Sequence, residues 1–310
     1  MEELKIQSVN ISEKKGIIKT PVECIELTEN GITNDAHAGS WHRQVSILGT
    51  ESIAKFSEQL NRNISPGEFA ENITLQGFNV TEAKVFDRIF CGKVELEVTQ
   101  IGKKCHGSNC AIFQESGNCV MPKEGVFCRV VKGGILKAGD IVQHIPKIVK
   151  IHVITLSDRA AAGVYEDKSG PFLAQLVTDY FKQNNRKVAI SSALIGDNAL
   201  QLKNLILESV ASKVDIIFTT GGTGIGTRDF TPDVVKPLLD KEIPGIMELI
   251  RVKYGMEHPN ALISRSIAGV AGTTLIYTLP GSTNAVKEYT DEILKTIEHS
   301  WRMLYRIDSH

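Results

Sequence analysis

The fold of the second half of this chain is decided by one stretch, residues 214–233, which reads VDIIFTTGGTGIGTRDFTPD. Its apolar run, residues 215–218, predicts a buried parallel strand, because β-branched and aromatic residues are bounded there by glycines. The glycines that follow permit backbone conformations and close approaches that a side chain would block. Thr231 is expected to cap the next helix, with Pro232 at its first position. A strand, a glycine loop and a helix start in this order present backbone N–H groups and a positive helix end, which suit an anion.

Asp229 follows this loop directly and is expected to lie beside the bound anion. A divalent cation that bridges this carboxylate to phosphate is the natural reason for its place. The loop is not a Walker P-loop, because no Gly-Lys-Ser/Thr follows it, and Thr227 stands where the dinucleotide fingerprint needs glycine. On composition alone, an ordinary glycine-rich turn remains the alternative.

Length and composition predict two domains in an ordinary globular chain. The 310 residues suffice for about two domains of ~150 residues. A net charge of −1 gives no reason to expect a nucleic-acid or membrane binder. The N-terminus, MEELKIQSVN, has no apolar core of a secretory signal, and no apolar run reaches the ~18 residues of a membrane span. We therefore expect a cytoplasmic protein.

The cysteines divide the chain into two chemically different halves. All six lie in the first half, and no C-x-x-C pair supports a structural zinc site. Two of them, Cys24 and Cys91, lie among strand-like apolar residues, which predicts that both are buried. The full set is Cys24, Cys91, Cys105, Cys110, Cys119 and Cys128.

The first half reads as short strands with one helix. Residues 4–30 alternate short apolar runs with polar residues, and residues 51–60 form an amphipathic pattern. Further strands are expected at residues 45–48, 85–90 and 94–98. This composition predicts a mostly β, barrel-like domain over residues 1–146, with the boundary near residues 144–147.

This half contains four motifs, GITNDAHAG, RQVSILG, SPGEFAENITLQG and EVTQIGKKCH. Together they resemble the MOSC domain, the C-terminal domain of molybdenum cofactor sulfurases. The resemblance covers roughly residues 5–145. It implies that this domain binds or delivers molybdenum cofactor or its sulfur, with Cys105 as sulfur carrier or metal contact. Lys104 stands where many members have proline and three cysteines follow, so the functional thiol stays open. The resemblance places four other residues in the cleft: Asp35, His37, Asn72 and Arg129.

The residues around Cys105 agree in part with this role. Lys103, Lys104 and His106 flank it, and nearby cations favour the thiolate, which is the nucleophile and a soft metal ligand. The alternative is a structural cysteine beside solvated lysines. For Asp35 and His37, the alternative is a hydrogen-bonded pair within a loop.

The second half alternates strands with helices, which predicts a doubly wound α/β sheet over residues 147–310. Ligands of such sheets bind outside the carboxyl ends of the strands. Polar residues follow four expected strands at that edge, so we expect one site there. The strands are expected at 150–156, 187–195, 215–218 and 275–279, and the helices at 171–181, 199–210, 232–240, 244–255 and 284–304.

The four loops read TLSDRAAAGVYEDKSG, LIGDN, TTGGTGIGTRDFTPD and LPGS, and two further segments are IPGIME and Ser264-Arg265. Together they carry a resemblance of the second half to the molybdopterin adenylyltransferases over residues 149–305. The resemblance implies that molybdopterin reacts with ATP and Mg²⁺, and that Asp197 and Asp229 hold the metal. It also implies a homo-oligomer, a trimer. The implied contacts to nucleotide and molybdopterin are Ser157, Asp158, Gly221, Gly222, Thr223, Gly224, Thr227, Glu248, Ser264, Arg265, Pro280, Gly281 and Ser282.

Other readings stay open for single residues and for the whole domain. Asp197 is placed to cap a helix, Asp158 to pair with Arg159, and Glu248 to pair with Arg251 on a helix surface. The domain as a whole could be a pterin-binding relative without adenylyl transfer, or a non-catalytic molybdopterin carrier or scaffold. The presence of both Asp197 and Asp229 favours catalysis.

Overall fold

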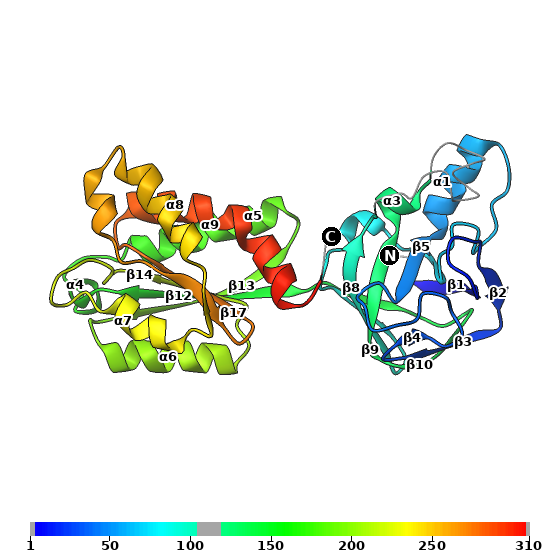
Figure 1. Cartoon of the computed structure of the whole chain (residues 1–310), viewed down its shortest axis with the longest axis horizontal. Coiled ribbons are helices and arrows are strands. Elements are labelled where there is room, and N and C mark those ends of the chain that lie inside the picture. Colours follow the sequence, from blue (N-terminus) through cyan, green and yellow to red (C-terminus); the bar gives the residue numbers. More distant parts are fainter. Residues whose placement is uncertain (1–3, 104–118, 308–310) are drawn as a thin grey trace. The chain divides into compact units, whose positions relative to one another are not determined.

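The computed structural model describes residues 4–103 and 119–307, which form two compact units. The first contains Met1–Lys147 and the C-terminal residues from Ile307, and the second contains Ile148–Arg306. No helix of the described residues is long and apolar enough to cross a membrane. The two units are described separately below and are drawn in Figure 1.

The first unit is built on an eight-stranded sheet in the order β11-β7-β8-β9-β5-β6-β1-β2 and a three-stranded sheet in the order β10-β3-β4. This agrees with the mostly β expectation. The strands are β1 (Lys5–Ile11), β2 (Thr20–Val22), β3 (Cys24–Thr28), β4 (Gly31–Ile32), β5 (Val45–Gly49), β6 (Ile73–Gln76), β7 (Arg88–Cys91), β8 (Val94–Ile101), β9 (Val126–Lys132), β10 (Gly134–Lys137) and β11 (Gln143–Ile145). The helical segments are α1 (Thr50–Leu60), η1 (Val80–Glu82) and α3 (Met121–Glu124).

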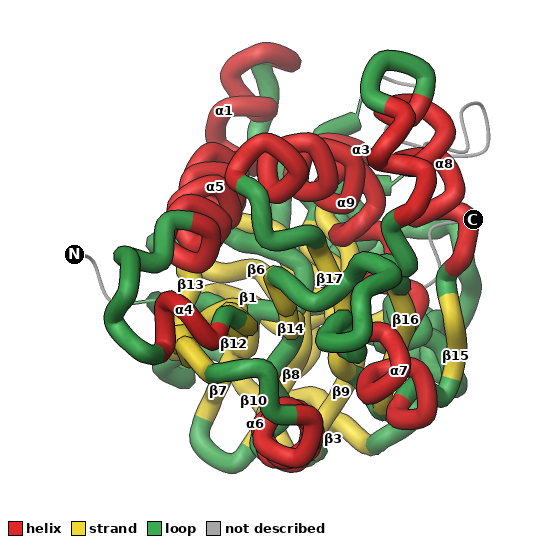
Figure 2. Tube along the Cα trace, turned by 90° about the vertical axis from the view of Figure 1, so that its left-hand side faces the viewer, coloured by secondary structure: helices red, strands yellow, loops and turns green. Residues whose placement is uncertain are grey.

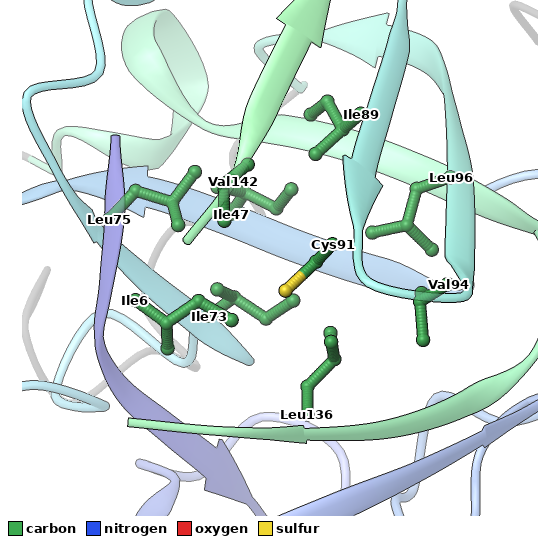
Figure 3. A pocket seen from close by; sticks show the side chains of 10 residues that line it. All are labelled: Ile6, Ile47, Ile73, Leu75, Ile89, Cys91, Val94, Leu96, Leu136 and Val142. Atoms are coloured by element: carbon green, nitrogen blue, oxygen red, sulfur yellow. The ribbon is translucent and has the colours of Figure 1, made fainter. Parts of the chain in front are cut away.

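Apolar side chains from several strands fill the interior of this unit around Cys91 (Figure 3). They leave a space of only about 10 Å³, which is about the least that holds one water. The lining is apolar, so this space is packing and not a ligand site. Burial raises the pKa of the Cys91 thiol to about 11, as expected for a cysteine that serves as a small apolar side chain.

Two expectations for the first unit were wrong in detail. Cys24 is exposed, because β3 alternates and places Ile25 and Leu27 inward, which turns Cys24 outward. The strand expected from residue 85 begins only at Arg88, since Phe86 has a left-handed backbone with φ of 77°. The amphipathic helix is confirmed as α1, with Ile53 and Phe56 buried.

The second unit is an α/β layer structure around a six-stranded sheet in the order β13-β12-β14-β17-β16-β15. Helices α5, α8 and α9 cover one face, and α6 and α7 cover the other (Figures 1 and 2). The strands are β12 (Ile148–Leu156), β13 (Lys187–Ile195), β14 (Ile216–Thr220), β15 (Lys241–Glu242), β16 (Ala268–Ala271) and β17 (Thr274–Leu279). The helices are α4 (Asp158–Ala161), α5 (Ser169–Gln183), α6 (Ala199–Ala211), α7 (Thr231–Val235), α8 (Pro244–Gly255) and α9 (Thr283–Leu304), with 3₁₀ turns η3 (Lys236–Leu238) and η4 (Pro259–Ile263).

The doubly wound prediction holds for four neighbouring strands of the sheet, β13, β12, β14 and β17, which are parallel. One edge differs, because β16 pairs with β17 and β15 pairs with β16 in antiparallel fashion. Gly272, with φ of 59°, makes the tight turn between β16 and β17 possible. The segment before this glycine was not expected to form a strand, since its short run of small residues carries no strong pattern.

Candidate functional site

Loops from four strands meet at one edge of the second unit's sheet. Parallel pairing aligns the ends of β12, β13, β14 and β17, with Leu156 opposite Ile195 and Thr220 opposite Leu279. The residues that follow these strands therefore lie at the same edge. The convergence expected from the sequence is present.

Two clefts open at this edge. The first, which we call the acidic cleft, has a volume of about 430 Å³. The second, which we call the Ser169 cleft, has a volume of about 460 Å³, and both are lined by Leu156 and Ser157. The acidic cleft is also lined by Asp158, Arg159, Asp197, Gly222, Gly226, Thr227, Arg228 and Asp229. The Ser169 cleft is also lined by Thr155, Tyr165, Glu166, Asp167, Lys168, Ser169, Gly281 and Thr283.

Three carboxylates gather in the acidic cleft. The Asp197 amide donates to Asp158 Oδ1 at 2.7 Å, and Arg228 Nη1 lies 3.4 Å from Asp158 Oδ2 and 3.9 Å from Asp197 Oδ2. Partial burial and then the negative charge of Asp158 raise the pKa of Asp197. Negative charge that raises the pKa of the Asp197 carboxyl would be offset by a bound cation.

The donor chemistry of this cleft fits Mg²⁺. That ion prefers oxygen ligands and is usually held by one or two carboxylates together with phosphate oxygens and water. Asp197 and Asp229 supply such oxygens, and Arg228 supplies a donor for phosphate. Among the described residues, no group of three His, Cys, Asp or Glu side chains could by itself hold a metal, so phosphate and water oxygens would have to complete the coordination of an ion at Asp197 and Asp229.

The glycine loop requires two of its glycines for steric reasons. Gly221 has φ of 98°, and a Cβ there would lie 2.4 Å from the Leu156 carbonyl oxygen. Gly222 has φ of 64°, and its Cβ would lie 2.5 Å from Thr231 Oγ1. The expected cap at Thr231 was wrong. Thr231 is the first residue of α7 and its hydroxyl donates to the Gly221 carbonyl at 2.9 Å, so it closes the loop instead.

The loop fixes the carboxylate of Asp229. The Gly226 amide donates to Asp229 Oδ2 at 2.8 Å, and the Asp229 amide donates back to the Gly226 carbonyl at 3.0 Å. A Cβ at Gly224 would lie 2.7 Å from Asp229 Oδ2. The glycines therefore leave the space in which this carboxylate sits.

Arg265 contacts the loop rather than an open cleft. Its Nε donates to the Gly224 carbonyl at 2.8 Å, its Nη2 donates to the Asp229 carbonyl, and its Nη1 donates to Asp233 Oδ1 at 2.8 Å. The Ser264 hydroxyl lies 3.0 Å from that of Ser266.

Several alternatives raised from the sequence can be compared with the geometry. Asn198 Oδ1 accepts from the Gln201 amide at 2.9 Å, so Asn198 and not Asp197 caps α6. Glu248 is exposed on α8 and lines neither of the two clefts. Arg251, the partner of Glu248 in the alternative reading, donates to the Ser266 carbonyl at 3.1 Å.

The remaining expected contacts lie on the turn after β17. Gly281 lines the Ser169 cleft, and a Cβ on it would lie 3.4 Å from the Gly221 Cα, so the two loops touch. Ser282 caps α9 through its hydroxyl, which accepts from the Ala285 amide at 3.3 Å. Pro280 precedes them. Thr223 belongs to the glycine loop and is buried.

Sequence reasoning named Ser157 and Gly281 of the Ser169 cleft but missed Asp167 and Ser169. The Ser169 hydroxyl lies 3.1 Å from Thr220 Oγ1 and donates to Asp167 Oδ1 at 2.9 Å. Asp167 Oδ1 also accepts from the Ser169 and Gly170 amides, which satisfies the start of α5. An acidic residue two positions before a helix start was the available signal.

In the first unit, Asp35 is the centre of a buried hydrogen-bond network. It accepts from the His37 amide at 2.9 Å, from Asn72 Nδ2 at 3.1 Å and from Lys19 Nζ. Lys19 was not predicted, and its Nζ also lies 3.3 Å from His37 Nδ1. The structure thus brings Asp35, His37 and Asn72 together, whereas Arg129 pairs with Glu97.

Burial and pairing act in opposite directions on this network. Burial would raise the pKa of Asp35, but hydrogen bonds from His37 and Lys19 outweigh it and hold that pKa well below its usual range. Burial lowers the pKa of Lys19 more than Asp35 raises it. Cys105, expected to be the reactive thiol, lies outside the described residues, as do Lys104, His106 and Cys110. Cys128 is buried, which raises the pKa of its thiol.

Both units match families of known proteins. Residues 152–299 match the family described as probable molybdopterin binding domain, and residues 34–143 match the MOSC domain. Molybdopterin adenylyltransferase of Helicobacter pylori is 33% identical over 152 residues, which cover 49% of this chain and 85% of that protein. The molybdopterin adenylyltransferase of Pyrococcus furiosus is 35% identical over 159 residues, which cover 50% of this chain and 90% of that protein.

A longer relative and a solved structure also match the second unit. Gephyrin of Dictyostelium discoideum is 35% identical over 156 residues, and the match spans 48% of this chain but 22% of gephyrin. A solved structure of MogA is 32% identical and covers 50% of this chain and 98% of its own, with a TM-score of 0.45.

Proposed function

This chain belongs to the molybdopterin-binding domain family and is related to molybdopterin adenylyltransferases, and on that premise we propose that its second unit transfers the adenylyl group of ATP to molybdopterin. The observation that carries this proposal is the acidic cleft, where Asp158, Asp197 and Asp229 meet the glycine loop and Arg228. Carboxylates, a guanidinium group and loop amides together suit a nucleotide phosphate with its metal ion.

In the proposed reaction, a phosphate oxygen of molybdopterin bonds to the α-phosphorus of ATP, and the bond from that phosphorus to pyrophosphate breaks. Asp197 and Asp229 would hold Mg²⁺, which offsets negative charge during such transfers. The glycine loop offers backbone N–H groups to the phosphates, and Arg228 offers a second positive group. Such chemistry depends mainly on positioning and charge stabilisation, which rigid loops supply.

The two clefts support a reaction with two substrates. They meet at Leu156 and Ser157, so a ligand in one cleft lies beside a ligand in the other. Ser157 is itself fixed, since its hydroxyl accepts from the Ala160 amide and lies 2.8 Å from Tyr165 Oη. We assign ATP phosphates and Mg²⁺ to the acidic cleft because its carboxylates and arginines match their charges.

For the first unit, we propose that the MOSC domain binds or delivers molybdenum cofactor or its sulfur. The network around Asp35 supports a site here, because Lys19, His37 and Asn72 converge on one buried carboxylate. Cys105 is proposed as the reactive thiol.

The alternative is a molybdopterin carrier or scaffold without catalysis. Purified protein incubated with ATP, Mg²⁺ and molybdopterin distinguishes the two by release of pyrophosphate. The proposal expects release that requires all three components and yields adenylylated molybdopterin. Binding of molybdopterin without pyrophosphate release would instead establish the carrier or the pterin-binding relative.

A further inference from the structure

The side chain of Arg265 connects two positions of the glycine loop with helix α7. Its guanidinium donates to the carbonyl oxygens of Gly224 and Asp229 and to the carboxylate of Asp233. Its backbone amide adds a fourth bond, to the Thr223 carbonyl at 2.8 Å. The loop is therefore held at its beginning, at its end and at the helix that follows.

Only arginine can make these bonds from one position. Its planar group presents five donors in fixed directions, whereas the lysine ammonium is a compact point charge on a flexible stem. All three guanidinium nitrogens of Arg265 have an acceptor, each in a different direction. This use of every nitrogen is typical of an arginine that holds a structure in place.

The backbone that carries Arg265 is itself held in place. Arg251 of α8 donates to the Ser266 carbonyl at 3.1 Å, and the Ile267 amide donates to Thr278 Oγ1 of β17 at 2.8 Å. The guanidinium of Arg265 thus extends from a segment that is fixed to the sheet.

Through the Asp229 carbonyl, Arg265 acts on the residue that faces the acidic cleft. Asp229 is held from inside the loop by the Gly226 amide and from outside the loop by Arg265. Without the outer bond, the backbone of Asp229 keeps only contacts within a loop of glycines, which lose more conformational freedom on ordering than other residues.

We propose that Arg265 is a positioning residue that fixes the Asp229 carboxylate for the metal–nucleotide complex, and does not itself bind substrate. This inference rests on the function proposed for the second unit. It replaces the ligand contact expected for Arg265 from the sequence.

The experiment compares the full chain with Arg265→Gln and Arg265→Lys. The control is Arg186→Gln, since Arg186 also has a strong partner, Glu298, with Nε–Oε1 of 2.7 Å. Arg186 precedes β13 and so lies at the opposite edge of the sheet from the acidic cleft. Two measurements are made, amide hydrogen exchange of peptides covering residues 222–231, and binding of Mn²⁺ in the presence of ATP by electron paramagnetic resonance.

We expect exchange in residues 222–231 to become about tenfold faster in both Arg265 variants, because charged hydrogen bonds are among the strongest in proteins. We expect Mn²⁺ binding to weaken about tenfold, whereas Arg186→Gln changes neither quantity beyond twofold. Asp233→Asn keeps an acceptor oxygen but removes the negative charge from one of the three partners of Arg265, and it should give a smaller change in the same direction.

Unchanged exchange in the Arg265 variants would overturn the proposal, as would faster exchange with undiminished Mn²⁺ binding. An equal effect of Arg186→Gln would also overturn it, because the loop would then respond to general destabilisation. Absence of pyrophosphate release from the wild-type protein contradicts the proposed transferase. If pyrophosphate release is absent but the exchange and Mn²⁺ results are as expected, the role of Arg265 is still supported.

Discussion

Asp229 is the single residue on which the proposed chemistry of the second unit most depends. We predict that Asp229→Asn keeps the fold and lowers the rate of adenylyl transfer about 100-fold or more. The reason is that loss of a metal-binding carboxylate removes several kcal/mol of stabilisation from the transition state. Pyrophosphate release at saturating ATP and molybdopterin measures this effect.

The matched control for Asp229 is Asp291→Asn, because Asp291 is a surface carboxylate that pairs with Lys287 at 2.9 Å. This control is expected to retain wild-type turnover. Turnover near wild type in Asp229→Asn itself would exclude the assigned role.

Asp35 is the residue that matters most for stability of the first unit. We predict that Asp35→Asn lowers the free energy of unfolding by about 3–5 kcal/mol, since it leaves the fully buried Lys19 ammonium without its counter-charge. Urea unfolding followed by a probe in the first unit measures the loss. The exposed Glu58 of α1 provides the control, and Glu58→Gln should change stability by no more than about 0.5 kcal/mol.

The same residue gives an expected pH dependence. The pKa of Asp35 is lower in the folded state than in the unfolded chain. The unfolded chain therefore binds the proton first, and the stabilisation present at neutral pH is lost as the pH falls below the usual range of a carboxyl group. Asp35→Asn should lose less stability than wild type over that acidic range, and an equal slope in both proteins would contradict this account.

Cys105 is predicted to be the most reactive thiol of the chain. With limiting alkylating reagent at neutral pH, we expect it to label at least about tenfold faster than Cys128, whose buried thiol has a raised pKa. Peptide mass spectrometry gives the rates. Cys24 serves as the exposed reference, because the structure places it at the surface.

The competing thiol is Cys110, and the variants Cys105→Ser and Cys110→Ser separate the two. Cofactor or sulfur binding should be lost only in the first. If Cys105 labels no faster than Cys24 and its serine variant binds normally, the first unit works without this thiol.

At the scale of elements, the glycine loop keeps a space that the Asp229 carboxylate fills. We predict that Gly224→Ala lowers adenylyl transfer about tenfold or more with little change in melting temperature. The added Cβ would lie 2.7 Å from Asp229 Oδ2, which must move, whereas the backbone of Gly224 is not among the positive-φ glycines. Initial rates and a thermal melt of the same sample test both parts.

Gly245 of α8 is the matched control, because nothing lies within 4 Å of a Cβ built there. Gly245→Ala should therefore retain activity. Equal loss in both variants would show that the steric argument at Gly224 is wrong.

At the scale of the whole molecule, α8 and its C-cap residue Met256 present an apolar stripe to the surface. Leu249, Val252 and Met256 are 55%, 59% and 83% exposed and recur at helical spacing. Large exposed apolar patches of this kind often mark protein interfaces. We predict that the chain self-associates through this stripe, as the trimer implied by its family resemblance.

Light scattering of the full chain tests this prediction across micromolar concentrations. Val252→Asp should shift the mass toward the monomer, while Lys203→Asp on α6 should leave it unchanged. A wild-type protein that stays monomeric throughout this range would contradict the prediction.

The sequence determined the elements that depend on local patterns. Strand β13 and helix α8 have the bounds expected from periodicity, because these features depend on neighbours within a few residues. The order of strands and helices also placed Asp158, Asp197 and Asp229 at one sheet edge, since parallel strands must end there.

Only the tertiary structure decided which side chains meet across long distances in the chain. Arg265 donates to the carbonyl of Gly224, 41 residues away, and Asn72 donates to Asp35, 37 residues away. No local sequence pattern distinguishes Lys19 from the other lysines, yet folding buries it against Asp35. Periodicity and capping report the local backbone, whereas these partners depend on how loops from different strands pack, and that packing is fixed only when the whole sheet has formed.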